Sequence, residues 1–251
     1  MMTRLTSLTA LALACVLTPS PVRAAEITVL CSNGLKAVME ELAPRFEKAS
    51  GHTVAVTYGL AAQLKTRIEA GEPFDLAVLT PAMLDDLITQ RRISADTRAV
   101  IARTGLGLLV RAGARKPDVS TTEAFRRALV AAASIAYAKE GASGVAFATL
   151  VQKLGLADQL KSKVQLTATG EEVGDRVARG AAEMGVLPLS EILPIKGAEL
   201  GGLFPADVQS YIVMVAGVNA AAKQGGAAKA FIAFMTAPAA LPVIEARGMQ
   251  R

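Results

Sequence analysis

The chain has 251 residues, enough for one large domain or for two lobes that each have a hydrophobic core. Its 27 basic and 22 acidic residues give a formal net charge of +5, which is a mild surplus. Aromatic residues make up 4% of the chain and Trp is absent, so the basic stripe with stacking aromatics of a nucleic-acid-binding protein is not expected.

The first 24 residues have the parts of a secretory signal peptide. Arg4 provides a positive start, an apolar run follows from 8 to 17, and Val22-Arg23-Ala24 ends it with small residues at the expected places. That run is only about half as long as a membrane span requires. We therefore expect residues 1 to 24 to be removed and the mature protein to be periplasmic. Two alternatives are an uncleaved anchor helix and a lipoprotein that begins at Cys15.

Strands and helices alternate along the rest of the chain. Short β-branched or apolar runs predict strands, and apolar residues three or four apart predict helices between them. The predicted strands are residues 26 to 30, 53 to 58, 74 to 80, 104 to 113, 134 to 138, 164 to 167, 184 to 189 and 210 to 218. Pro44 lies inside the first predicted helix and predicts a kink or an early break there. The alternation predicts an α/β fold with mainly parallel strands.

The order of these elements predicts two α/β lobes joined by two hinge strands. Two strand–helix series are separated by long apolar strands, which lets the chain leave the first lobe and return to it. We expect lobe 1 to contain residues 25 to 105 and 217 to 251, and lobe 2 to contain residues 106 to 216. Ligands of such folds bind at the carboxyl ends of strands, so we expect a ligand cleft between the lobes.

Residues that commonly carry catalysis or bind metals are scarce in the mature chain. Cys31 and His52 are its only cysteine and histidine, so neither an internal disulfide nor a usual zinc set can form. The motifs HExxH and GxSxG are absent, and adjacent acidic pairs such as Glu171-Glu172 diverge on a helix. We therefore expect a binding protein without a cofactor or metal, and not an enzyme.

Three segments carry a resemblance to a known family. They are "LKTRIEAGEPFDLAVLT" at the end of residues 27 to 80, "GASGVAFATLVQKLGL" and "EEVGDRVARGAAEMGVLPLSEI". Together they resemble the periplasmic substrate-binding proteins of ABC importers, and within them the molybdate/tungstate-binding group. The resemblance covers nearly the whole mature chain. It implies the two-lobed periplasmic-binding-protein fold, a small anionic ligand, an ABC permease in the inner membrane as partner, and a monomer.

The resemblance also implies a set of candidate binding residues. In that family, hydroxyls and backbone N–H groups at helix N-termini hold an oxyanion from both lobes, where the positive end of the helix dipole lies. The matching positions here are Ser32, Asn33, Gly34, Ala61, Ala62, Ser143, Gly144, Val173 and Pro188. Lys139 follows a predicted strand at the cleft end of lobe 2 and is a candidate partner for an anion. Lys36 and Arg67 are weaker candidates that we expect on the surface.

Several side-chain donors of that family are absent at the matching positions. Gly34, Ala61 or Ala62, and Pro188 stand where hydroxyl groups are expected. Each missing hydrogen bond to a charged ligand costs about 1.5 to 3 kcal/mol. We therefore expect a larger pocket, and the ligand is left open between an oxyanion and a small organic carboxylate. An alternative function is a ligand-sensing protein that reports to a membrane receptor.

Overall fold

The computed structural model describes residues 24–251. Apart from Ala24, the predicted signal peptide lies outside the described residues, and so does Cys15. Three strand–helix units come first: β1 (Glu26–Ser32), α1 (Lys36–Ser50), β2 (Thr53–Gly59), α2 (Ala61–Glu69), β3 (Leu76–Leu79) and α3 (Pro81–Thr89). β1 lies between β2 and β3 and is parallel to both.

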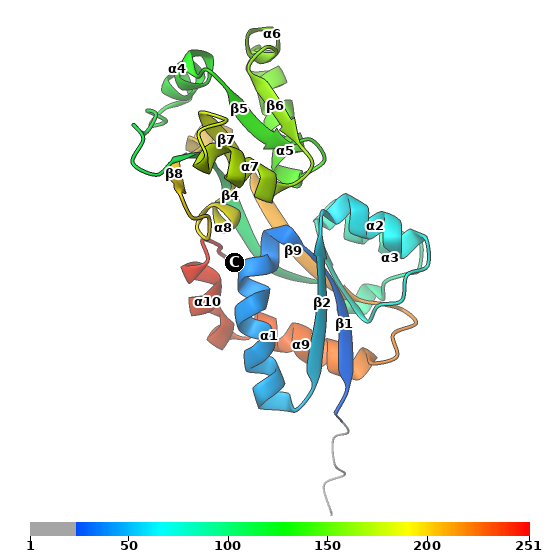
Figure 1. Cartoon of the computed structure of the whole chain (residues 1–251). Helices are drawn as coiled ribbons and strands as arrows, with labels where there is room; N and C mark the ends of the chain where they lie inside the picture. The colour runs from blue at the N-terminus through cyan, green and yellow to red at the C-terminus, as the bar shows by residue number, and fades with distance from the viewer. Residues whose placement is uncertain (1–23) are drawn as a thin grey trace, which may run out of the picture.

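A second series of elements forms the other end of the molecule (Figure 1). It contains α4 (Thr122–Ala131), β5 (Ile135–Ala138), α5 (Ala142–Lys153), α6 (Ala157–Leu160), β6 (Val164–Thr167), α7 (Gly170–Ala178), β7 (Met184–Pro188), α8 (Leu189–Ile192) and β8 (Ala198–Leu203). Here β5 is the central strand and is parallel to both β6 and β7. The predicted α/β architecture with parallel strands in each series is confirmed.

Two long strands lie between the two series in the sheet. β4 (Ala99–Arg111) is antiparallel to β9 (Tyr211–Val218) as far as Gly105, and from Leu106 onward it pairs instead with β7 and β8. The other neighbour of β9 is β3. A single strand therefore changes partners between Gly105 and Leu106, and this point separates the two ends of the molecule.

The division of the chain into lobes remains a proposal, and the strand pairing refines it. The predicted exit after residue 105 coincides with the change of partners in β4. β9 pairs only with β3 of the first series and with the part of β4 before Leu106, so we place the return crossing before Tyr211 rather than at residue 216.

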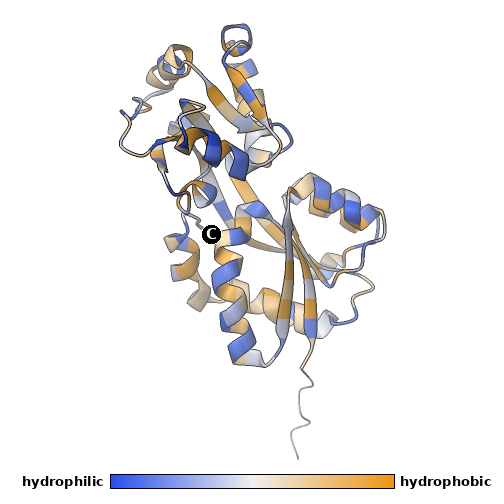
Figure 2. Ribbon diagram, in the orientation of Figure 1, coloured by the Kyte–Doolittle hydropathy of each residue, from blue (hydrophilic) through white to orange (hydrophobic). Residues whose placement is uncertain are grey.

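The C-terminal helices pack beside the first strand–helix series. α9 (Gly225–Thr236) and α10 (Leu241–Ala246) pack near α1, and Phe46 lies 4.7 Å from Phe231 between ring centroids. Polar residues gather on the outer sides of the helices, whereas the strands are mostly apolar (Figure 2). Short 3-10 helices in the described part of the chain are Asn33–Leu35, Ala95–Thr97, Ala206–Val208 and Pro238–Ala240. In residues 24–251 no single helix is long and apolar enough to cross a membrane, although the pair Gly225–Thr236 and Pro238–Ala246, bent by 63°, passes on length and composition.

Two local expectations differ from the structure. The early break predicted at Pro44 does not occur, because α1 runs on to Ser50. Proline removes one helical hydrogen bond, but its carbonyl partner belongs to the exposed residue Glu40, where water can replace it, and Phe46 beyond the proline anchors the last turn in the core. The strand β8 was not predicted, since its sequence AELGGL has two glycines and no β-branched residue.

Candidate functional site

The first-lobe half of the site is built where β1 ends. Ser32 is the last residue of β1 and is only 6% exposed, and no hydrogen bond from its hydroxyl is found within residues 24–251. The side chain of Asn33, the next residue, also has no hydrogen-bond partner within residues 24–251. α2 begins beside them at Ala61, and no side chain caps its N-terminus. The first N–H groups of a helix have no partner inside it, so α2 leaves donors available here.

The second-lobe half repeats this arrangement at the end of β5. α5 begins at Ala142 without a side-chain cap, and Ser143 is 4% exposed. Gly144 allows the close approach of α5 to β5, because a Cβ there would lie 1.8 Å from the carbonyl oxygen of Ala138. The hydroxyl of Ser143 has no hydrogen-bond partner in the described chain. Two buried serines from opposite lobes are thus left with free hydroxyls.

These two halves meet at a small space that we call the inner cavity, with a volume of about 30 Å³. Six of the ten predicted site residues line it: Ser32, Asn33, Gly34, Ala61, Ser143 and Pro188. The other four do not line it. Gly144 packs against β5, Ala62 is half-buried on α2, Val173 is buried among the apolar residues of the α7 cluster, and Lys139 is exposed.

The extra space expected over Gly34 is occupied. A Cβ at residue 34 would lie 2.5 Å from the methyl carbon of Met214, which reaches over from β9. The expectation of a larger pocket at this point is therefore wrong, because an apolar side chain from a strand distant in sequence fills the room that the missing hydroxyl leaves. Ile212 of the same strand also lines the inner cavity.

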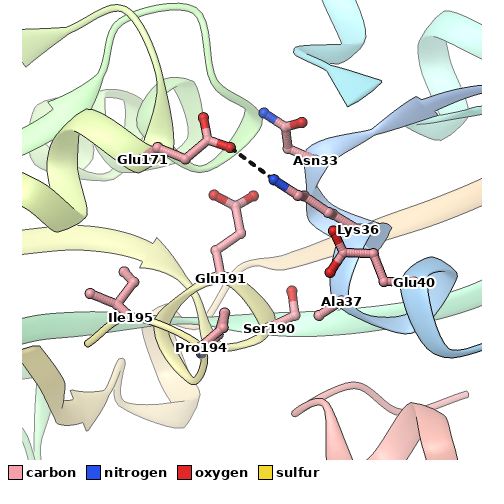
Figure 3. A pocket seen from close by; sticks show the side chains of 10 residues that line it. Asn33, Lys36, Ala37, Glu40, Glu171, Ser190, Glu191, Pro194 and Ile195 are labelled. Carbon is pink, nitrogen blue, oxygen red and sulfur yellow. Dashed lines mark hydrogen bonds and ion pairs between the residues drawn. The ribbon is translucent and has the colours of Figure 1, made fainter. Parts of the chain in front are cut away.

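A second, larger space opens beside the inner cavity, and we call it the outer pocket. Its volume is about 340 Å³, and it shares Asn33, Gly170 and Glu191 with the inner cavity. Lys36 lines it, with its Nζ 3.5 Å from the Glu171 carboxylate across the two lobes (Figure 3). The same Nζ lies 5.6 Å from the centre of the Tyr58 ring. Lys36, expected on the surface, is thus the cation of the cleft. Arg67, the other surface candidate, pairs with Glu72 instead.

Glu191 is the charged side chain common to both spaces. Its carboxylate points into the outer pocket near Glu171 and Lys36 (Figure 3), and it forms no hydrogen bond or ion pair within the described chain. Burial and the like charge of Glu171 raise the pKa of Glu191 to about 7, while Lys36 acts in the opposite direction. The carboxyl group therefore holds its proton to a higher pH than an ordinary glutamate does.

The backbone around Glu191 is tied to the first lobe. The hydroxyl of Ser190 donates to the carbonyl oxygen of Gly34 at 3.0 Å, and the amide of Ser190 donates to Thr104 Oγ1 at 3.3 Å. On the other side, Gly170 makes room for the carboxylate, because a Cβ there would lie 2.4 Å from Oε2 of Glu191. The position of Glu191 is thus set by both lobes.

Of the site residues outside the sequence prediction, Glu191 alone has a local sequence signal. Glu191 follows shortly after Pro188 at the end of β7, which is where ligand-binding side chains are expected in α/β folds. The contacts with Gly170 and Met214 have no local signal, since they join segments far apart in the chain.

Cys31 is fully buried at the end of β1, and burial raises the pKa of its thiol. It therefore behaves as a small apolar residue at a strand end.

Comparisons with known proteins agree with this architecture. Residues 27–250 match the family model described as bacterial extracellular solute-binding protein. The chain is 30% identical to an aconitate isomerase of a Pseudomonas species over 94% of both chains. It is also 30% identical to the molybdate-binding protein of Azotobacter vinelandii over 90% of both chains.

A solved structure shows the same fold. The periplasmic molybdate-binding protein of Azotobacter vinelandii superposes with a TM-score of 0.76 at 22% identity, covering 90% of this chain and 99% of its own. The two-lobed fold implied by the family resemblance is confirmed by this match. The chain therefore belongs to the bacterial extracellular solute-binding proteins, as its resemblance to the molybdate-binding group predicts.

Proposed function

We propose that this solute-binding protein holds a small organic anion, with one carboxylate of the ligand in the inner cavity and the rest in the outer pocket. The observation that carries the proposal is the convergence of two uncapped helix N-termini, α2 and α5, with the free hydroxyls of Ser32 and Ser143. All of these groups donate hydrogen bonds, and they enter one cavity from both lobes.

The physics of this donor set favours an anion. Unpaired N–H groups and the positive ends of two helix dipoles favour negative charge without a counter-ion. Each hydrogen bond to a charged group contributes about 1.5 to 3 kcal/mol. Because the donors belong to different lobes, binding stabilises the closed arrangement in proportion to the difference in affinity between the closed and open forms.

The shape of the two spaces favours an organic anion over a bare oxyanion. A cavity of about 30 Å³ has room for two or three water-sized groups at most, since each needs about 10 to 15 Å³. Gly34, Ala61 and Pro188 add no side-chain donors, so few hydroxyl groups are available to a tetrahedral oxyanion. The outer pocket has the volume of a small-molecule site and supplies Lys36 for a second negative group. A molybdate-like oxyanion is the competing ligand.

The biological setting is proposed from the family. A solute-binding protein with a secretory leader would deliver its ligand in the periplasm to an ABC permease of the inner membrane, and we expect it to act as a monomer. The match to the solute-binding family and the molybdate-binding relative favour transport over the sensing alternative.

A thermal-shift panel on the mature protein tests the ligand class. The panel contains small mono-, di- and tricarboxylates, molybdate, tungstate, sulfate and phosphate. A ligand at 100 times its dissociation constant stabilises by about 2.7 kcal/mol, or roughly 5 to 10 °C for a chain of this size. We expect di- or tricarboxylates to give the largest shift. A shift with molybdate and tungstate alone would show that the cleft is an oxyanion site.

A second candidate function is isomerisation of a small unsaturated tricarboxylate in the same cleft. Two observations favour it: the aconitate isomerase relative, and a carboxyl group with a pKa of about 7 at the junction of the two spaces. The prediction that the protein is not an enzyme therefore stays open. The test is incubation of the purified protein with cis-aconitate, with the trans isomer followed by proton NMR. No conversion above the rate in buffer would remove this candidate.

A further inference from the structure

We propose that Glu191 is the catalytic acid–base of a 1,3-proton shift on an unsaturated polycarboxylate held across the inner cavity and the outer pocket. The inference rests on the proposed carboxylate-binding function, and it assigns a reaction and a residue to that site. Its substrate class is a small acid with a CH2 group between a carboxylate and a carbon–carbon double bond.

The position of Glu191 suits a group that acts on the middle of such a ligand. It lines both spaces, so a molecule that spans them passes its carboxylate. The close contact with Gly170 and the hydrogen bond from Ser190 to Gly34 hold its backbone and side chain in place. The carboxylate has no partner within residues 24–251, so its oxygens are available to a ligand.

The surroundings of Glu191 suit proton transfer at neutral pH. The other charged groups that line the outer pocket are Lys36 and Glu40 of α1 and Glu171 of α7. Burial and Glu171 raise the pKa of Glu191 to about 7, and Lys36 lowers it. A general acid–base is most effective when its pKa lies near the working pH, because both protonation states are then populated.

The proposed step is balanced without any co-reactant. Ionised Glu191 takes a proton from the CH2 carbon, which breaks a C–H bond and forms an O–H bond on the carboxyl group. The electron pair spreads over the allylic carbons and the adjacent carboxylate. Glu191 then returns this proton, or a hydron that has exchanged with solvent while on the carboxyl group, to the former vinyl carbon, and the double bond moves by one position. In a propene tricarboxylate the product has the same connectivity, so the net change is between cis and trans isomers.

The remaining donors of the cleft have a role in this step. The carbanion places extra negative charge on a carboxylate, and preorganised donors stabilise charge that develops in a transition state. The N-termini of α2 and α5 and the hydroxyls of Ser32 and Ser143 face the inner cavity, where that carboxylate would lie. Binding and catalysis therefore use the same donors, while proton transfer depends on Glu191.

The test compares the mature wild-type protein with Glu191→Gln in D2O, with cis-aconitate as the probe. Glutamine keeps the size of the side chain but cannot transfer a proton, so we expect isomerisation and deuterium incorporation to fall at least 100-fold. Affinity for the saturated analogue propane-1,2,3-tricarboxylate, measured by calorimetry, should stay within about threefold. Glu140→Gln, in the exposed loop after β5 and outside both spaces, is the matched control and should keep the wild-type rate.

The outcomes distinguish a failure of the catalytic role of Glu191 from a failure of the carboxylate-binding function. If the wild type binds the tricarboxylate but neither isomerises nor exchanges it, the Glu191 inference is wrong and the binding function stands. If no carboxylate binds, the proposed function itself fails. A Glu191→Gln rate within tenfold of the wild type would also overturn the inference. Glu191→Asp provides a second check, because a titrating base predicts a rate that rises through the pKa near pH 7 in the wild type and a displaced profile in this variant.

Discussion

The inner cavity and the outer pocket adjoin each other but have opposite chemistry. The inner cavity is about 30 Å³, lacks charged side chains apart from Glu191 at its edge, and is supplied with N–H and hydroxyl donors from both lobes. The outer pocket is about 340 Å³ and carries Lys36, Glu40 and Glu171 as well. A ligand that satisfies both needs an anionic head and a larger polar body. This difference favours a polycarboxylate over a compact oxyanion.

The largest expected effect comes from filling the inner cavity with Ser143→Leu. The longer side chain occupies a space of about 30 Å³ and removes a donor, so we expect the affinity for any anionic ligand to fall at least 1000-fold, about 4 kcal/mol. Isothermal titration calorimetry measures the loss. Val145→Leu on the same helix is the control, since Val145 is 54% exposed. An affinity of Ser143→Leu within threefold of the wild type would place the head group elsewhere.

The next effect concerns the pH dependence of stability and depends on Glu191. Its pKa is raised from 4.5 in the unfolded chain to about 7 in the folded protein. The favourable contribution of the neutral carboxyl group is complete below pH 4.5 and is lost as the pH rises through 7. The loss is at most about 3.5 kcal/mol, because the pKa rises by about 2.5 units and one unit corresponds to about 1.4 kcal/mol.

Urea unfolding at a series of pH values measures this contribution without a ligand. The wild type should lose stability relative to Glu191→Gln between pH 5 and pH 8. If the free energies of unfolding of the two proteins changed equally with pH, Glu191 would be well solvated. The inner cavity and the outer pocket would then differ less in their electrostatic character.

The smallest expected effect, on ligand affinity, distinguishes the role of the outer pocket from that of the inner cavity. Lys36→Met keeps the aliphatic stem but removes the charge, so a tricarboxylate that reaches the outer pocket should bind about tenfold more weakly, while acetate, which fits the inner cavity alone, should be unaffected. Calorimetric titrations with both ligands test this, with Lys48→Met on the exposed end of α1 as the control. An equal loss for the two ligands would contradict the separate roles.

Local patterns predicted the fold and much of the inner cavity. Hydrophobic periodicity located β1 and β5, and the family resemblance pointed to Ser32 and Ser143 just beyond their ends, where helices begin. Such positions are predictable because strand ends and helix starts have short-range signals. The close fit of α5 to β5 at Gly144 belongs to the same class, since both partners lie within a few residues.

The rest of the site arises from contacts between distant segments. Met214 of β9 fills the space over Gly34, and Glu191 lies against Gly170 of another helix. The sequence near Gly34 does not predict its contact with Met214, and the sequence near Glu191 does not predict its contact with Gly170. β8 was missed for a similar reason: its six residues have weak strand propensity, and their pairing with the outer half of β4 determines their conformation.

We propose that two uncapped helix N-termini and two serine hydroxyls without partners hold the carboxylate of an organic anion. A crystal structure of the mature protein with propane-1,2,3-tricarboxylate tests this most directly. We expect one carboxylate within hydrogen-bond distance, about 2.7 to 3.2 Å, of the Ser32 and Ser143 hydroxyls and the first N–H groups of α2 and α5, with a second carboxylate near Lys36. A tricarboxylate bound outside both spaces, or an inner cavity that takes up only molybdate from a mixture of the two anions, would contradict it.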